Sequence, residues 1–108
     1  MKIAISAEGE KLTDNISEVF ARCPNFIFAE IKNNKIGDIQ IMKNSAVDQM
    51  SGAGVAVAQM VAEKGAQAVI AGNIGPRACD VLRQFQIEVY HGEGKIEKVL
   101  EDFIKQRL

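Results

Sequence analysis

The alternation of apolar and polar residues divides the chain into short strands and longer amphipathic segments. Five segments have the length and apolar content of strands: residues 2–6, 26–31, 36–42, 68–71 and 87–90. Residues 68–71 are wholly apolar, which is typical of a strand buried on both faces. In residues 36–42, Ile39 and Ile41 alternate with polar neighbours, which indicates a strand with one solvated face.

Three segments with apolar residues at helical spacing follow the third, fourth and fifth strands. The predicted helices are residues 55–64, a helix that starts at Pro76, and residues 95–106. This element order predicts a single α/β domain over residues 1–108. Antiparallel pairing of the first three strands and right-handed crossovers give a mixed five-stranded sheet in the order 3-2-1-4-5, with strand 2 antiparallel. That is a ribonuclease-H-like arrangement with three helices.

Two glycine-rich segments precede predicted helices and are the first candidates for a binding site. Gly72 and Gly75 lie between the fourth strand and Pro76, and Gly52 and Gly54 lie just before the predicted helix of residues 55–64. Free N–H groups at a helix start favour an anionic ligand, particularly beyond the carboxyl ends of strands. The same glycines also suit a plain tight turn, so both interpretations stay open. Neither segment matches a Rossmann fingerprint or a P-loop.

The connection between the first two strands contains a cysteine. We expect Ser17 to cap a short helical turn through Ala21, and Pro24 to end it. Cys23 is therefore expected on a loop, exposed and chemically available. Cys23 and Cys79 do not have a metal-binding spacing, and a disulfide is not expected between them.

Composition excludes several classes of function. The net charge is −1, with no clustered basic face, so nucleic acid is not an expected partner. No apolar run is long enough to span a bilayer, and the first residues enter a strand at once, so we expect a cytoplasmic protein that does not bind membranes. The single histidine, His91, has no partner in the sequence that completes a catalytic group. We therefore expect a binding protein and not an enzyme.

Several short motifs occur in a recognisable order along the whole chain. They are Met1-Lys-Ile-Ala-Ile, Val19-Phe-Ala-Arg-Cys-Pro-Asn-Phe26, Ser51-Gly-Ala-Gly54, Gly72-Asn-Ile-Gly-Pro-Arg-Ala78 and Gly92-Glu-Gly94. Together they resemble the dinitrogenase iron–molybdenum cofactor biosynthesis family. The resemblance implies a ribonuclease-H-like fold and non-catalytic binding of an iron–sulfur or molybdenum-containing cluster, or of its precursor. It also implies cluster-assembly proteins as partners.

The resemblance and the glycine-rich helix starts together give a set of candidate binding residues: Arg22, Cys23, Gly52, Gly54, Gly72, Gly75 and Arg77. Cys23 is the candidate metal ligand in this set. Val19 and Ser51 stand where some family members have histidine, which leaves open another ligand set or another ligand. The alternative function is a regulatory module that binds an anionic metabolite or a partner protein. The roles of Cys79 and His91 stay open.

Overall fold

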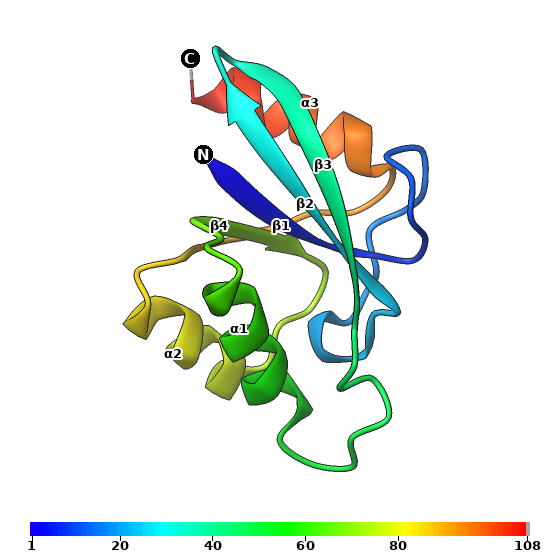
Figure 1. Cartoon of the computed structure of the whole chain (residues 1–108), viewed down its shortest axis with the longest axis vertical. Helices are drawn as coiled ribbons and strands as arrows, with labels where there is room; N and C mark the ends of the chain where they lie inside the picture. The colour runs from blue at the N-terminus through cyan, green and yellow to red at the C-terminus, as the bar shows by residue number, and fades with distance from the viewer. Residues whose placement is uncertain (108) are drawn as a thin grey trace.

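The computed structural model describes residues 1–107, which form five strands, three α-helices and one 3-10 turn (Figure 1). The strands are β1 (Lys2–Ala7), β2 (Asn25–Lys32), β3 (Lys35–Lys43), β4 (Ala68–Ala71) and β5 (Glu88–His91). The helices are α1 (Ala53–Glu63), α2 (Pro76–Gln84) and α3 (Ile96–Gln106), and the 3-10 turn is Phe20–Arg22. The predicted elements are all present, and most of their bounds agree within about two residues.

The sheet has the predicted order, β3-β2-β1-β4-β5. β2 is antiparallel to both of its neighbours, whereas β4 is parallel to β1 and β5. β1 and β4 lie side by side in the middle, with Ile5 opposite Ile70. The carboxyl ends of β1, β4 and β5 therefore meet at one edge of the sheet.

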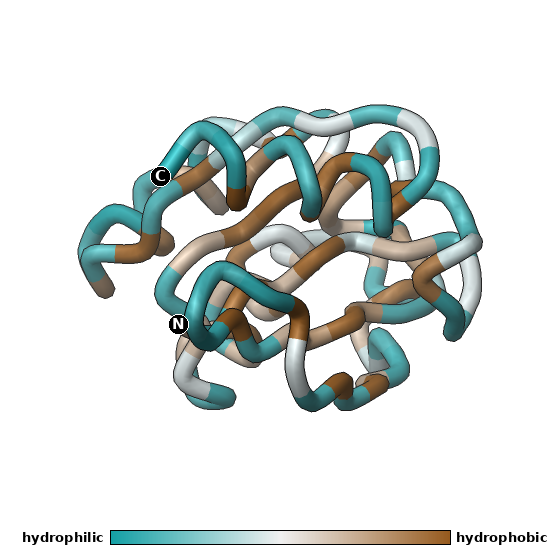
Figure 2. The backbone as a smooth tube through the Cα atoms, turned by 90° about the horizontal axis from the view of Figure 1, so that it is seen from above, coloured by the Kyte–Doolittle hydropathy of each residue, from teal (hydrophilic) through white to brown (hydrophobic). Residues whose placement is uncertain are grey.

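Helices cover both faces of the sheet and make three layers (Figures 1 and 2). α1 and α2 pack on one face, over a core that includes Phe26, Phe28 and Val69. α3 packs on the other face, where Leu100 and Phe103 contact the side of the sheet that carries Ile5 and Ile70. The apolar segments of the central strands lie between the two helical layers, because each strand has one core on either side.

Local residue chemistry sets the turns between these elements. Asn33 and Asn34 both have positive φ, 52° and 61°, as the tight turn of the β2–β3 hairpin requires. Gly65, with φ 83°, follows the end of α1, where a left-handed residue is common.

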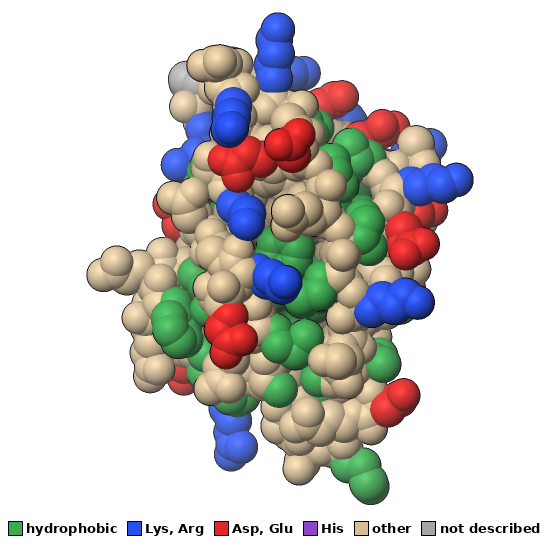
Figure 3. Space-filling model, in the orientation of Figure 1, with side chains coloured by type: hydrophobic (Ala, Val, Ile, Leu, Met, Phe, Trp, Pro, Cys, Tyr) green, Lys and Arg blue, Asp and Glu red, His purple; other side chains and the backbone are tan. Residues whose placement is uncertain are grey.

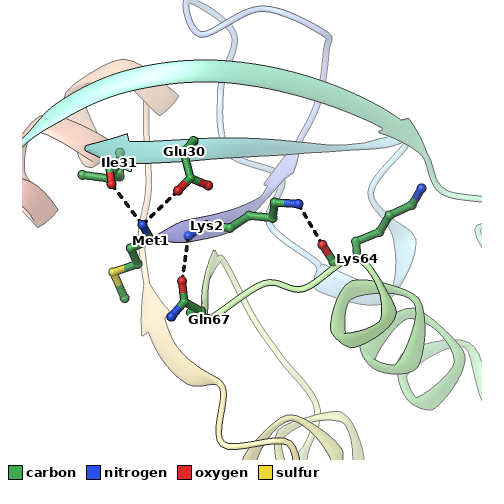
Figure 4. Close-up of polar contacts among 6 residues, drawn as sticks. All are labelled: Met1, Lys2, Glu30, Ile31, Lys64 and Gln67. Atoms are coloured by element: carbon green, nitrogen blue, oxygen red, sulfur yellow. Dashed lines mark hydrogen bonds and ion pairs between the residues drawn. The ribbon is translucent and has the colours of Figure 1, made fainter.

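The amino-terminal end of the sheet is held by polar contacts of the first two residues (Figure 4). The Met1 ammonium lies 3.1 Å from Glu30 Oε1 and 3.0 Å from the carbonyl oxygen of Ile31. Lys2 Nζ donates to the Lys64 carbonyl at 2.9 Å, which ties β1 to the end of α1. These contacts lie at the opposite end of β1 from the edge where the strands' carboxyl ends meet.

Two expectations about local structure were wrong. Ser17 does not cap the short helix: its backbone instead bonds Ser6 and Gly72, and the 3-10 turn starts after Val19 without a side-chain cap. β3 is solvated on both faces, since Ile39 and Ile41 remain 37% and 40% exposed. The core under α3 reaches Ile36 but not these two residues, because the hairpin continues past the helix.

Among residues 1–107, no helix is long and apolar enough to cross a membrane. On the face shown in Figure 3, basic and acidic side chains are intermingled around apolar ones.

Candidate functional site

The starts of α1 and α2 face one hollow of about 480 Å³ beyond the carboxyl end of β4. It is lined by Val19, Phe20, Ala21, Gly52, Gly54, Val55, Asn73, Gly75, Pro76, Arg77 and Ala78. Four of the predicted binding residues, Gly52, Gly54, Gly75 and Arg77, therefore meet at one place although they come from two separate segments. We call this space the helix-start hollow.

Small residues allow the two helix starts to approach each other. A Cβ atom on Gly54 would lie 3.4 Å from the Cβ of Ala78 and 3.9 Å from that of Ala21, so the three backbones are already close. Gly52 has φ 70°, a left-handed conformation that sharply redirects the chain into α1. Larger side chains at these positions would push α1 away from α2 and fill the hollow.

The polar groups at the helix-start hollow favour an anion. The first helical backbone bonds are donated by Ala56 to Gly52 and by Cys79 to Gly75, both at 3.0 Å. The N–H groups before these donors have no partner inside the helix and carry its positive partial charge. Arg77 adds an exposed guanidinium at the rim. Apart from Asn73, the remaining walls, including Val19 and Pro76, are apolar.

Gly72 lies outside this hollow and has a structural reason to be glycine. A Cβ atom there would lie 2.4 Å from the carbonyl oxygen of Glu18 and 2.7 Å from its Cα. The Gly72 N–H already donates to Ser17, at 3.2 Å, and the Asn73 N–H to Glu18, at 2.6 Å. Phe20 N–H donates back to Asn73 at 3.0 Å. Three backbone hydrogen bonds thus attach residues 17–20 to the turn between β4 and α2.

Further short bridges hold the rest of the long connection after β1. Ala7 pairs with Ile16, Asn15 with Lys95, and Val19 with Asn73. The connection is therefore anchored to three different parts of the fold before it reaches Phe20.

Arg22 points away from the helix-start hollow and holds the loop after β3. Its Nη1 donates to the carbonyl oxygens of Val47 at 2.8 Å and Gln49 at 2.5 Å. Neither Arg22 nor Cys23 lines the hollow. The structure therefore separates these two predicted residues from Gly54 and Arg77.

The expectation that Cys23 is exposed and reactive was wrong. Its side chain is fully buried and packs in the core under α1 and α2. Its Sγ donates to the Phe20 carbonyl at 3.3 Å, and Asn44 Nδ2 donates to the Cys23 carbonyl at 2.9 Å. Burial raises the pKa of this thiol to about 12, well above neutral pH. Cys23 does lie on a loop, as Pro24 predicted. Its burial depends on Phe20 and Asn44, which pack against it in the tertiary structure.

A second hollow, of about 450 Å³, lies beside the first. It is lined by Asn15, Ile16, Ser17, Glu18, Gly72, Asn73, His91, Gly92, Glu93 and Gly94. His91 Nδ1 lies 3.1 Å from the Gly72 carbonyl oxygen, and His91 Nε2 lies 3.2 Å from Glu93 Oε1. The carbonyl of Gly72, and after it the carboxylate of Glu93, raise the pKa of His91. We call this space the histidine hollow.

The histidine hollow could not be predicted from the sequence. Its polar side chains come from three distant segments, and only the adjacency of β4 and β5 brings His91 to Gly72. The position of His91 at the end of the last strand was the one available signal.

Cys79 is half-buried on α2 and lines neither hollow. In the part of the chain that the structure describes, no three His, Cys, Asp or Glu side chains gather closely enough to hold a metal ion.

Sequence and structure comparisons agree on the relatives of this chain. An uncharacterised protein of Methanocaldococcus jannaschii is 34% identical over 100% of this chain and 89% of its own length. Among solved structures, the apo form of the orange protein from Desulfovibrio gigas has a TM-score of 0.88 at 27% identity, covering 98% of this chain and 88% of that one. A Thermotoga protein with a provisional NifB designation has a TM-score of 0.81 at 26% identity, with coverages of 98% and 89%.

The family assignment rests on nearly the full length of the sequence. The model of the family described as dinitrogenase iron-molybdenum cofactor matches residues 1–106. The resemblance seen in the ordered motifs is thereby confirmed, and the chain belongs to the dinitrogenase iron–molybdenum cofactor family.

Proposed function

We propose that this protein is a non-catalytic carrier that binds an anionic iron–sulfur or molybdenum-containing cluster, or its precursor, in the helix-start hollow. The observation that carries the proposal is the convergence of two helix starts and Arg77 on one apolar-walled space in a chain of this family. Proteins that load and unload the cluster are the partners this function requires. We also assign the sheet topology to the ribonuclease-H-like class.

The residues at the hollow suit a cluster held as an intact anion. The N–H groups of α1 and α2 and the Arg77 guanidinium donate hydrogen bonds and oppose negative charge. Sulfide ligands are polarisable, and walls such as Val55 and Pro76 suit them better than they suit a strongly hydrated oxyanion. A volume of about 480 Å³ is roughly sixteen times the ~30 Å³ share of one liquid water molecule, so a multi-atom ion fits.

Direct coordination by Cys23 fits this structure poorly. A metal-ligating cysteine must be a thiolate, whereas burial raises the pKa of Cys23 to about 12. The side chain also faces the core and not the hollow. The proposal therefore does not depend on Cys23 as a metal ligand, and a cysteine variant tests that role separately.

A catalytic function has less support. The ring nitrogens of His91 contact Gly72 and Glu93 and not a cysteine. Cys23 is buried, so it does not present a nucleophile to either hollow. Binding without chemistry is the simpler account of these contacts.

The test is anaerobic reconstitution with iron, sulfide and either molybdate or tetrathiomolybdate, followed by metal analysis and visible absorption. Val55→Asp places a carboxylate in the hollow, while an acidic residue in the first turn favours the helix, so we expect a folded protein that loses the chromophore. Arg77→Gln is expected to weaken binding, and Arg83→Gln, in the last turn of α2, serves as the matched control. Equal loading of Val55→Asp and wild type would contradict the proposal.

Cysteine variants separate the two modes of cluster binding. Binding as an intact anion predicts full loading of Cys23→Ala and Cys79→Ala. Loss of the chromophore in Cys23→Ala alone, with the fold intact, would restore coordination by that thiol. Thermal stabilisation by phosphate or nucleotides in place of the cluster compounds would favour the alternative function, a module that binds an anionic metabolite.

A further inference from the structure

His91 and Glu93 form a preorganised pair of ligands at the rim of the histidine hollow. They are two residues apart at the end of β5, and Gly92 between them is fixed. A Cβ atom on Gly92 would lie 2.8 Å from Ile70 and 2.9 Å from Val99, and its N–H donates to Ala71 at 2.9 Å. The intervening backbone is thus buried, while both side chains reach the same space.

The histidine ring is oriented as metal-binding histidines usually are. The Gly72 carbonyl can only accept a hydrogen bond, so Nδ1 carries a hydrogen atom. In the neutral ring this leaves the Nε2 lone pair directed toward the Glu93 carboxylate. Two acceptors that face each other need a positive charge between them, either a proton or a metal ion. A backbone carbonyl behind the ring is the common outer contact of a ligating histidine.

The distance between the two ligand atoms matches a coordination sphere. His91 Nε2 and Glu93 Oε1 are 3.2 Å apart. Bonds of about 2.0–2.2 Å at a tetrahedral angle place an imidazole nitrogen and a carboxylate oxygen about 3.3–3.5 Å apart. The hollow of about 450 Å³ leaves room for water ligands, and Glu18 adds negative charge to its lining.

We propose that His91 and Glu93 bind a borderline divalent transition metal ion, of the class of Zn²⁺ or Ni²⁺, with water completing the coordination. The combination of imidazole and carboxylate suits these ions better than Ca²⁺ or Mg²⁺, which prefer oxygen ligands alone. The site is separate from the helix-start hollow, although Asn73 lines both. The proposed metal site is therefore independent of the proposed cluster-carrier function.

The experiment titrates Zn²⁺ into the full chain carrying Cys79→Ala, which removes the half-buried thiol as a competing ligand. His91 is the only histidine, so its ring resonances in nitrogen-15 NMR report the site directly. We expect 1:1 binding with Nε2 ligation, and at least a tenfold weakening in His91→Gln and in Glu93→Gln. Glu63→Gln, an exposed change at the end of α1, is the charge-matched control.

Two results would overturn the proposal. One is unchanged His91 resonances at saturating Zn²⁺. The other is an affinity in His91→Gln and Glu93→Gln equal to that of the Glu63→Gln control, which would identify adventitious surface binding. Both altered side chains are exposed, so loss of the fold is not expected to obscure the comparison.

Discussion

Substitution of Gly72 by alanine tests whether this glycine serves the fold or a ligand. The new Cβ would lie 2.4 Å from the Glu18 carbonyl oxygen, and ordinary contact begins at 3.4 Å. The 17–20 segment must therefore retreat by about 1 Å. That movement stretches the hydrogen bonds from Gly72 to Ser17, from Asn73 to Glu18 and from Phe20 to Asn73.

The energetic cost follows from the overlap and the strained hydrogen bonds. Overpacking costs about 1–3 kcal/mol, and each weakened hydrogen bond about 0.5–1.5 kcal/mol. The reduced entropy of the unfolded chain returns about 0.4–1 kcal/mol. We expect Gly72→Ala to lower the free energy of unfolding by about 1.5–7 kcal/mol. For a domain of this length the melting temperature then falls by roughly 7–30 °C.

Gly75→Ala is the matched control, since Gly75 lies three residues away in the same turn. Its φ is −66°, and a Cβ atom would meet nothing within 4 Å. We expect a change within about 1 kcal/mol, because the lower entropy of the unfolded chain offsets a poorer N-cap. Urea unfolding followed by circular dichroism measures both variants. Equal stability of the two variants would refute the packing explanation for Gly72.

Four further predictions concern residues in and near the loops around the candidate site. In the native protein iodoacetamide should label Cys79 and leave Cys23 unmodified, as mass spectrometry after digestion can check. Burial raises the pKa of the Cys23 thiol in the folded protein to about 12, from 9.0. The stability that this buried thiol contributes is therefore complete below pH 9 and should be lost as the pH rises toward 12. A free energy of unfolding that does not change over that range would contradict the burial of Cys23. Asn44→Ala should cost about 2–4 kcal/mol in urea unfolding, because this buried side chain donates to two carbonyls and accepts from one N–H. Arg22→Met should cost at most about 1 kcal/mol but speed amide hydrogen exchange after β3, and unchanged exchange there would show that its two hydrogen bonds do not order the loop.

The sequence was sufficient for the fold because local and long-range signals agree. Residues 68–71 are apolar throughout, and the strand there ends where Gly72 begins. Pro76 marked the start of α2, and Asn33 and Asn34 are residues that tolerate the positive φ of the β2–β3 turn. The sequence also allowed the two helix starts to be placed together, because helices that follow parallel strands begin at the same edge of the sheet. The four residues concerned are Gly52, Gly54, Gly75 and Arg77.

Features that depend on contacts between distant segments could not be predicted from the sequence. Exposure of Cys23 was inferred from its loop position, but Asn44, from the segment after β3, closes over it. The packing reason for glycine at position 72 was missed, because the approach of Glu18 cannot be read from the sequence around the turn. The histidine hollow likewise exists only because β5 lies beside β4.

The anchoring of the long connection after β1 has a kinetic consequence. A segment paired with β1, with the start of α3 and with the β4–α2 turn is not free to act as a lid. The wall that this connection gives to each hollow is therefore preformed, and we expect ligand capture to need no opening of the connection. Observed association rates should rise in proportion to ligand concentration without a plateau, and release should determine how long a cargo is retained.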